Sequence, residues 1–327
     1  MSVLLQVEGL EVQYRAPAGL GDLVARRPRR VTRAVNGISF EIEKGDTLGL
    51  VGESGCGKST LGRALLRLTP AAGGQVRFAG EDVLGMPAEK LLAFRRRAQM
   101  VFQDPFASLN PRLTVAETLG EVLAVHRLCS PRELASRVRE LMARVGLPWE
   151  FAGRRAAALS GGQCQRVGIA RALAMGAELI VADEPVSALD VSIQAQILNL
   201  FTRLQREMGL TLLFISHDLG VVRHLCRRVA VMYLGRIVEM GPTEELFENP
   251  RHPYTRALIE AIPRMAPDST LAPALAGELP SIVKPPTGCP FHPRCSEAMA
   301  QCRGGEPPAR RSVDGREVWC HLYPPAV

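Results

Sequence analysis

The stretch Gly52-Glu53-Ser54-Gly55-Cys56-Gly57-Lys58-Ser59 decides the fold, because it matches the phosphate-binding pattern GxxxxGK(S/T). A short apolar strand at 47–51 precedes it and a helical pattern at 60–68 follows it, as the pattern requires. Glycines let backbone N–H groups turn toward phosphates, and the helix N-terminus adds the positive end of its dipole. We therefore predict that residues from Gly52 to Thr60 bind the phosphates of a nucleotide.

Two residues of this loop have specific expected roles. Lys58 is placed to reach the β- and γ-phosphates, and the hydroxyl of Ser59 is a ligand for Mg²⁺. Cys56 occupies a position at which the pattern accepts any residue, so we interpret it as a small spacer and not as a nucleophile.

A second strand supplies carboxylates. Residues 179–182 are four apolar residues, and Asp183 and Glu184 follow them directly. Asp183 is placed to hold Mg²⁺, and Glu184 can polarise an attacking water. Many buried strands end in acids, so this pattern gains its meaning only together with the phosphate loop.

The wider pattern is one of alternating strands and helices. Strands are predicted at 5–14, 38–42, 47–51, 179–182 and 212–215, and a helix at 192–208. Such alternation indicates an α/β fold with a mainly parallel sheet covered on both faces. The segment 91–158 is mostly helical in character, with a helix start near 131–134, and predicts an inserted helical subdomain.

The motif Leu159-Ser160-Gly161-Gly162-Gln163 resembles the signature sequence of ATP-binding cassette (ABC) ATPases. This resemblance covers about residues 4–245. It implies a P-loop NTPase of the ABC type, with a RecA-like core, an antiparallel β subdomain and a helical subdomain at about 91–160, together spanning residues 1–246. In that family the signature contacts the γ-phosphate of ATP held by the opposite subunit, so a site is complete only in a dimer.

Further positions fit the same family. Gln103 resembles the glutamine that senses Mg²⁺ and couples to the membrane subunit, and His217 the switch histidine on the γ-phosphate. Tyr14 is similar to the aromatic residue that stacks on adenine. The resemblance thus implies Glu184, His217 and Gln103 as catalytic residues and Ser59, Gln103 and Asp183 around Mg²⁺. The loop expected to cross the dimer interface is Ser187-Ala188-Leu189-Asp190. Cys164 departs from the family, in which a basic residue is usual, and we expect altered packing there at most.

Details of the loops and the tail point to a subfamily. The segments 52–63, 102–112, 249–258 and 288–295 resemble the ATPase subunits of dipeptide and oligopeptide importers, with residues 247–327 as their C-terminal extension. That resemblance implies a second related ABC ATPase, two transmembrane permeases and an extracytoplasmic substrate-binding protein as partners. Nickel and glutathione importers belong to the same group, so those cargoes remain alternatives to peptides.

The proline-rich tail contains the cysteines Cys289, Cys295, Cys302 and Cys320, spaced C-x5-C-x6-C-x17-C. Four thiolates suit either a 4Fe–4S cluster or tetrahedral zinc, and the spacing matches neither a standard zinc motif nor a ferredoxin. The family resemblance favours the cluster, with zinc and simple reduced thiols as the alternatives. We expect such a site to staple an extension that has little core of its own.

Composition limits the other function classes. The chain has 327 residues and a formal charge of +7, and no apolar run approaches the ~20 residues of a membrane-spanning helix. The N-terminus shows no signal-peptide pattern, which predicts a cytoplasmic protein. The importer resemblance implies a peripheral location at the cytoplasmic face of the inner membrane. The basic charge would also allow an ABC ATPase that acts on DNA or ribosomes. A single compact cassette with an importer-type tail disfavours that alternative, and we expect no nucleic-acid partner.

Overall fold

The computed structural model describes residues 2–15, 31–262, 278, 280–305 and 308–323. The chain divides into two compact units. One contains Met1–Val3, Ile42–Thr47 and Gly85–Ser216, and the other Leu4–Glu41, Leu48–Leu84 and His217–Val327. Among the described residues, no helix is both long and apolar enough to cross a bilayer.

The sheet of the first unit is parallel. Its strands are β6 (Ala98–Val101), β7 (Leu179–Asp183) and β8 (Thr211–Ser216), with β7 pairing with both of its neighbours. All residues of β7 and β8 are buried, which explains their continuous apolar sequences. β6 lies inside the segment expected to be mostly helical, so this segment also supplies a strand that the sequence did not predict. Four residues carry no readable periodicity, and pairing with β7 decides their conformation.

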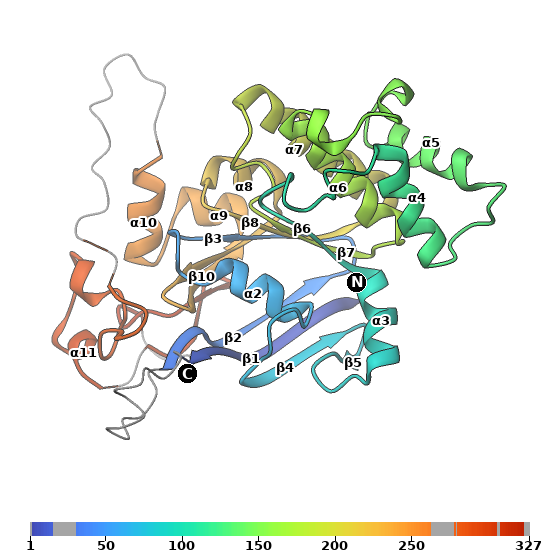
Figure 1. The fold of residues 1–327 in the computed structure, drawn as a ribbon. Coiled ribbons are helices and arrows are strands. Elements are labelled where there is room, and N and C mark those ends of the chain that lie inside the picture. The colour runs from blue at the N-terminus through green and yellow to red at the C-terminus, as the bar shows by residue number, and fades with distance from the viewer. Residues whose placement is uncertain (1, 16–30, 263–277, 279, 306–307, 324–327) are drawn as a thin grey trace, which may run out of the picture. The chain divides into compact units, whose positions relative to one another are not determined.

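The first unit also contains five α-helices among its described residues. They are α3 (Ala88–Arg97), α4 (Val115–Val125), α5 (Leu134–Arg144), α6 (Gly161–Ala174) and α7 (Val191–Met208). Figure 1 shows α4, α5 and α6 gathered together as the green part of this unit. Single turns of 3₁₀ helix at Trp149–Phe151 and Ala156–Ala158 lead into α6. The helix predicted at 192–208 is confirmed as α7.

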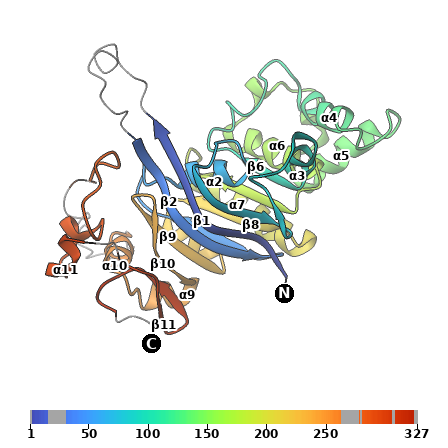
Figure 2. The same cartoon turned by 90° about the horizontal axis from the view of Figure 1, so that it is seen from below.

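The second unit contains an antiparallel sheet in the order β2-β1-β4-β5. Its strands are β2 (Val31–Glu43), β1 (Val3–Arg15), β4 (Gly73–Phe78) and β5 (Glu81–Asp82). Figure 2 shows the long β1 and β2 running side by side. Buried and exposed residues alternate along much of β1 and β2, as in a sheet with one covered face.

A second group of strands in this unit carries the phosphate loop. β3 (Thr47–Val51) pairs in parallel with β9 (Arg228–Tyr233), and β10 (Arg236–Pro242) pairs with β9 in the antiparallel direction. The helix α2 (Lys58–Leu65) begins directly after the loop that follows β3, while α8 (Leu219–Leu225) and α9 (Thr243–Glu248) flank β9 and β10 in sequence. The predicted strand–loop–helix unit is thus confirmed.

The tail belongs to the second unit. Its elements are α10 (Pro253–Glu260), the 3₁₀ turn His292–Arg294, α11 (Ala300–Arg303), β11 (Arg311–Val313) and β12 (Arg316–Val318). β12 pairs with β10, and β11 pairs with β12. Figure 2 shows β11, α9 and α10 close together near the C-terminal end of the chain.

A buried carboxylate anchors this tail. Glu239 of β10 is fully buried and accepts hydrogen bonds from the backbone N–H groups of Arg251 and His252 at 2.9 and 2.8 Å. The guanidinium of Arg316, which is also buried, lies 3.7 Å from the same carboxylate. A buried charge needs such partners, so Glu239 fixes where the chain enters α10 and where β12 returns.

Candidate functional site

The phosphate loop has a backbone that only glycine can follow at two positions. Gly52 and Gly57 have φ of 154° and 108°. A Cβ at Gly52 would collide with the carbonyl oxygen of Met232, and one at Gly57 with that of Ala34. These glycines therefore allow the loop to pass close to neighbouring backbone before α2 begins.

Lys58 is held inside the loop. Its side chain is buried, and its Nζ donates hydrogen bonds to the carbonyl oxygens of Gly52 and Glu53 at 2.8 and 3.0 Å. Cys56 is fully buried beside it, and burial raises the pKa of the thiol although Lys58 opposes this effect. The thiol is therefore protonated at neutral pH, which agrees with a spacer role.

The start of α2 is suited to an anion. No acidic residue lies in its first turn, so the N-terminal N–H groups and the dipole are not neutralised from within the helix. Ser54 and Gly55 are exposed, and Ser59 and Thr60 are half-buried. Tyr14 at the end of β1 is 46% exposed, and its hydroxyl lies 3.4 Å from that of Thr60. An exposed ring at this place could stack on a flat base.

In the first unit, the carboxylates stand at the end of β7. Asp183 is buried and Glu184 is half-buried. The backbone φ of Glu184 is 45°, which is unusual for a residue other than glycine. The backbone N–H of Glu184 donates to the carbonyl of Ile215, and its side chain accepts a hydrogen bond of 3.1 Å from the amide of Gln103. Strain of this kind costs roughly 1–3 kcal/mol and often marks a functional position. The structure thus brings together two of the three residues expected to be catalytic.

The signature sequence forms the N-terminus of α6. The Ser160 hydroxyl accepts from the backbone N–H of Gln163, and the Gln163 side chain accepts from the backbone N–H of Ser160. Ser160 itself is exposed at the helix end. A Cβ at Gly162 would collide with Ile193 of α7, so glycine lets these helices approach closely.

The segment expected to cross a dimer interface lies beside the signature. A Cβ at Gly161 would stand 3.0 Å from the side chain of Leu189. Ser187 donates from its hydroxyl and its backbone N–H to the carbonyl of Glu184, which ties this segment to the end of β7. Ala188 and Asp190 are exposed, and Asp190 precedes α7 as its N-cap residue.

His217 is exposed to solvent, whereas Cys164 is buried. His217 directly follows β8 and is exposed. Cys164 is fully buried, lies 3.5 Å from the carbonyl of Ala156, and has a pKa raised to about 11 by burial. The thiol therefore packs as a small neutral group.

The four tail cysteines are free thiols, three of them buried. Burial, together with the charges of neighbouring cysteines, raises the pKa of Cys289 and of Cys320 to about 11. The cysteines are therefore within electrostatic reach of one another. However, in the described part of the chain no group of three or more His, Cys, Asp and Glu side chains is arranged to hold a metal ion. The prediction of an iron–sulfur cluster or zinc is not supported by this arrangement.

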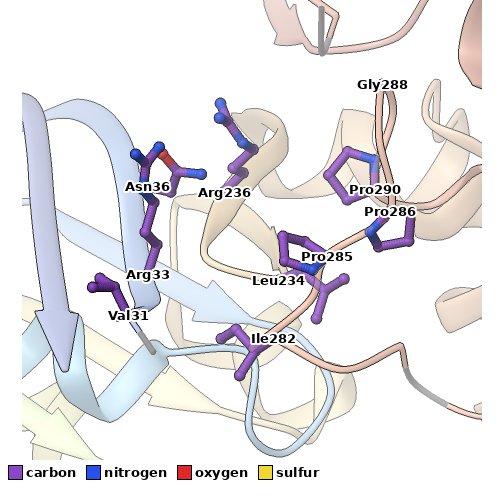
Figure 3. A pocket seen from close by; sticks show the side chains of 10 residues that line it. All are labelled: Val31, Arg33, Asn36, Leu234, Arg236, Ile282, Pro285, Pro286, Gly288 and Pro290. Carbon is purple, nitrogen blue, oxygen red and sulfur yellow. The ribbon is translucent and has the colours of Figure 1, made fainter. Parts of the chain in front are cut away.

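A pocket of about 300 Å³ lies between the start of β2 and the tail (Figure 3). The close-up shows Arg33 and Asn36 on one side, Arg236 of the β9–β10 hairpin beside them, and prolines of the tail opposite. Burial and the charge of Arg33 lower the pKa of Arg236. Its lining contains no residue of the phosphate loop, so this pocket is distinct from the candidate nucleotide site.

Two tail residues that no sequence motif indicates touch the phosphate loop. Tyr254 accepts a hydrogen bond of 3.0 Å from the backbone N–H of Glu53, and Arg294 makes an ion pair with the carboxylate of Glu53. Both lie in tail segments that resemble importer extensions, but those segments carry no spacing that indicates contact with a loop some 200 residues earlier.

Comparison with known proteins places these features in context. Residues 35–187 match the family described as ABC transporter, and residues 238–302 the family described as oligopeptide/dipeptide transporter, C-terminal region. A probable peptide ABC transporter ATP-binding protein of Sinorhizobium fredii is 52% identical over 325 residues, which cover 99% of this chain and 91% of that protein. An oligopeptide transport ATP-binding protein of Escherichia coli is 48% identical over 309 residues, with 93% and 92% covered.

A solved structure is similar as well. It is a dimeric ATP-binding cassette in a post-hydrolysis state, bound to ADP and phosphate. Its TM-score is 0.64 at 27% identity, and the match covers 73% of this chain and 99% of that one.

Proposed function

Because this chain belongs to the ATP-binding proteins of the oligopeptide/dipeptide ABC transporters, we propose that it hydrolyses MgATP to energise the import of short peptides. One observation carries this proposal: a single chain joins an ABC cassette to the C-terminal region of the peptide transporters. ATPases of nickel or glutathione importers remain the alternative, since the cassette itself does not touch the cargo.

We assign the following roles to the residues of the site. The loop from Gly52 to Thr60 holds the phosphates through its backbone N–H groups, Lys58 and Ser59, and Tyr14 stacks on adenine. The Mg²⁺ ion is held by Asp183, Ser59 and Gln103. Glu184 orients the attacking water, and His217 contacts the γ-phosphate. The hydrogen bond between Gln103 and Glu184 supports their joint role, because it fixes the carboxylate that acts on water.

The proposal includes a dimer and membrane partners. The solved relative with ADP and phosphate is dimeric, which supports a second ATPase subunit whose signature completes the site. Two permeases and an extracytoplasmic substrate-binding protein would complete the importer, with this chain peripheral at the cytoplasmic face. We also propose that residues 1–246 form the cassette and residues 247–327 the extension, because the chain matches a cassette family and then a C-terminal transporter family.

A groove on the helical part of the first unit suits a permease segment. It has a volume of about 620 Å³ and lies between α4, α5 and the turn at Trp149. Its floor is apolar, with Leu134, Val138 and a Trp149 ring that is 39% exposed, while Glu117 and Glu121 stand on its rim. An apolar groove with acidic edges fits a short amphipathic helix that carries basic residues.

Filling this groove should uncouple the chain from its permeases. Ala135 is an exposed residue of α5 that lines the groove, and Ala135→Trp would place an indole in it. We expect complex assembly, measured by co-purification with tagged permeases, to fall at least ~10-fold. The indole would occupy the groove, so the anchor side chains of the permease could not be buried there. ATP binding by the isolated chain should stay normal.

Ala143→Trp is the matched control, because Ala143 is exposed on the same helix but does not line the groove. Equal assembly of the Ala135→Trp and Ala143→Trp proteins would contradict the assignment of the groove.

For the tail, we propose that Cys289, Cys295, Cys302 and Cys320 bind a 4Fe–4S cluster in the native protein, with zinc as the alternative. The mutual effects on their pKa values support a shared site. A cubane cluster is larger than a single ion and therefore keeps its thiolates farther apart than zinc does. The role we propose for such a group is structural, because the proline-rich tail has little apolar core of its own.

One purification tests both the cargo and the metal. The complex, isolated anaerobically from its own host, should contain two ATPases and two permeases, and in proteoliposomes it should take up di- or oligopeptides with ATP hydrolysis. Uptake of nickel or glutathione without peptides would overturn the cargo assignment.

The same preparation tests the metal site of the tail. It should contain iron and sulfide and absorb at ~400 nm. Zinc without iron would refute the cluster, and four freely alkylated thiols would refute both metals.

A further inference from the structure

Glu53 is the point at which the tail contacts the phosphate loop. Its carboxylate accepts two hydrogen bonds from the guanidinium of Arg294, at 2.7 and 3.0 Å, in a two-pronged ion pair. Its backbone N–H donates to the hydroxyl of Tyr254, and its carbonyl accepts from Lys58. Every polar group of Glu53 is thus engaged, two of them by the tail and one by the lysine of the loop.

The ion pair is well shielded. The side chain of Arg294 is 4% exposed and that of Glu53 is 25% exposed. The hydrogen bonds to Glu53 raise the pKa of Arg294, so the guanidinium is charged throughout the physiological range. Such two-pronged pairs fix both partners in orientation, and a partly buried pair is less screened by salt than one on the surface.

Aromatic packing holds Arg294 in place. Arg294 is the last residue of the turn His292–Arg294, which begins directly after Phe291. The ring of Phe291 lies 5.3 Å from the rings of both Tyr233 and Tyr254, between centroids. Tyr254 in turn is fixed by His252, whose Nδ1 accepts the Tyr254 backbone N–H. Tyr233, which packs against Phe291, also interacts with the guanidinium of Arg294, so the aromatic cluster supports the pair with Glu53.

The negative charge of Glu53 makes its ion pair with Arg294 important for phosphate binding. A carboxylate in a loop that must accept the anionic phosphates of ATP opposes binding by like-charge repulsion. Arg294 supplies the compensating charge and also draws the carboxylate toward the tail. Lys58 alone cannot serve both purposes, because its Nζ is the group that must reach the phosphates.

We propose that Arg294 of the C-terminal extension is a positioning residue of the nucleotide site, which neutralises Glu53 and holds the phosphate loop in the shape that accepts ATP. The extension is then part of the ATP-binding apparatus of this chain and not only an attachment to it. This inference rests on the proposed function, since it assumes that the loop binds ATP.

The test uses the full-length chain and a fluorescent MgATP analogue. Replacement in Arg294→Met removes the charge but keeps a long apolar side chain in the aromatic surroundings. We expect the dissociation constant for the nucleotide to rise at least ~10-fold, because a shielded carboxylate loses its partner beside the phosphates. Turnover of the assembled transporter at saturating ATP should change less than about twofold, so the effect appears in KM and not in kcat.

A second substitution separates charge from structure. In the double variant Glu53→Gln with Arg294→Met, no unpaired carboxylate remains, and we expect most of the lost affinity to return. Arg294→Lys keeps the charge but not the two-pronged geometry, and should give an intermediate affinity. The control is Arg310→Met, because Arg310 forms its ion pair with Glu317 of β12 and should leave nucleotide affinity unchanged.

The outcomes separate this inference from the function on which it rests. If the unmodified chain binds no MgATP, the proposed function fails. If it binds MgATP and Arg294→Met binds equally well, only the role of Arg294 is refuted. Equal losses in Arg294→Met and in the double variant would likewise refute it, because a disturbed tail explains such a result without any charge effect. If Arg294→Met does not fold, the Arg294→Lys and Glu53→Gln single variants replace it. Unchanged nucleotide affinity in both of them would overturn the inference.

Discussion

Replacement of Glu184 by Gln should leave ATP binding intact and lower turnover by at least ~100-fold, within the range for a lost catalytic base. Gln keeps the size of the side chain and can still contact the amide of Gln103, with which Glu184 shares a hydrogen bond of 3.1 Å. It cannot polarise water as a carboxylate does. We expect the variant to accumulate as a nucleotide-bound dimer, detected by sedimentation in the presence of MgATP.

Glu207→Gln is the control for this variant, because Glu207 is an exposed acid on α7 of the same unit. It should hydrolyse ATP at the normal rate in the assembled transporter. A Glu184→Gln complex with near-normal turnover would show that another group acts on the water.

Replacement of Ser160 by Asp should abolish turnover without affecting ATP binding to the loop at Lys58. Asp is a good N-cap residue, so the N-terminus of α6 should remain folded. Its charge, however, would face the γ-phosphate of the nucleotide held by the second subunit. Like-charge repulsion should then prevent closure of the dimer, with a loss of at least ~100-fold in ATPase activity.

The same experiment tests whether a single chain is sufficient. Activity per unmodified chain should be low in dilute solution and rise with concentration or with the partner ATPase. Ser160→Thr keeps both the cap and the neutral hydroxyl, and should retain most of the activity. Full activity of a proven monomer, or of the Ser160→Asp protein, would rule out a signature that acts on the other subunit.

The parts of the site that the sequence predicted are those defined by local spacing. β3, the phosphate loop and α2 follow one another within about 20 residues, and glycines, lysine and serine there each have a specific backbone or charge requirement. The same holds for β7, whose apolar residues lead directly to Asp183 and Glu184. Such motifs combine periodicity and chemistry in one short stretch, which is why they are readable.

The features that were missed depend on contacts between distant residues. Glu239 reads as an ordinary polar residue of a strand, yet it is fully buried because backbone groups of residues 251 and 252 and the Arg316 side chain meet it. Arg294 and Glu53 are 241 positions apart. No local pattern distinguishes either carboxylate from a solvent-facing one, because their partners are set by tertiary packing.

The pairing of the tail with β10 also bears on the solubility of the protein. Without β12, the largely buried strand β10 would present unpaired backbone groups near Glu239 and Met240, a template on which strands of other molecules can add. The tail replaces this exposed edge with β11, which is only three residues long and begins with an arginine. Short, charged outer strands are poor templates for aggregation, so we expect β11 and β12 to protect the sheet from growth between molecules.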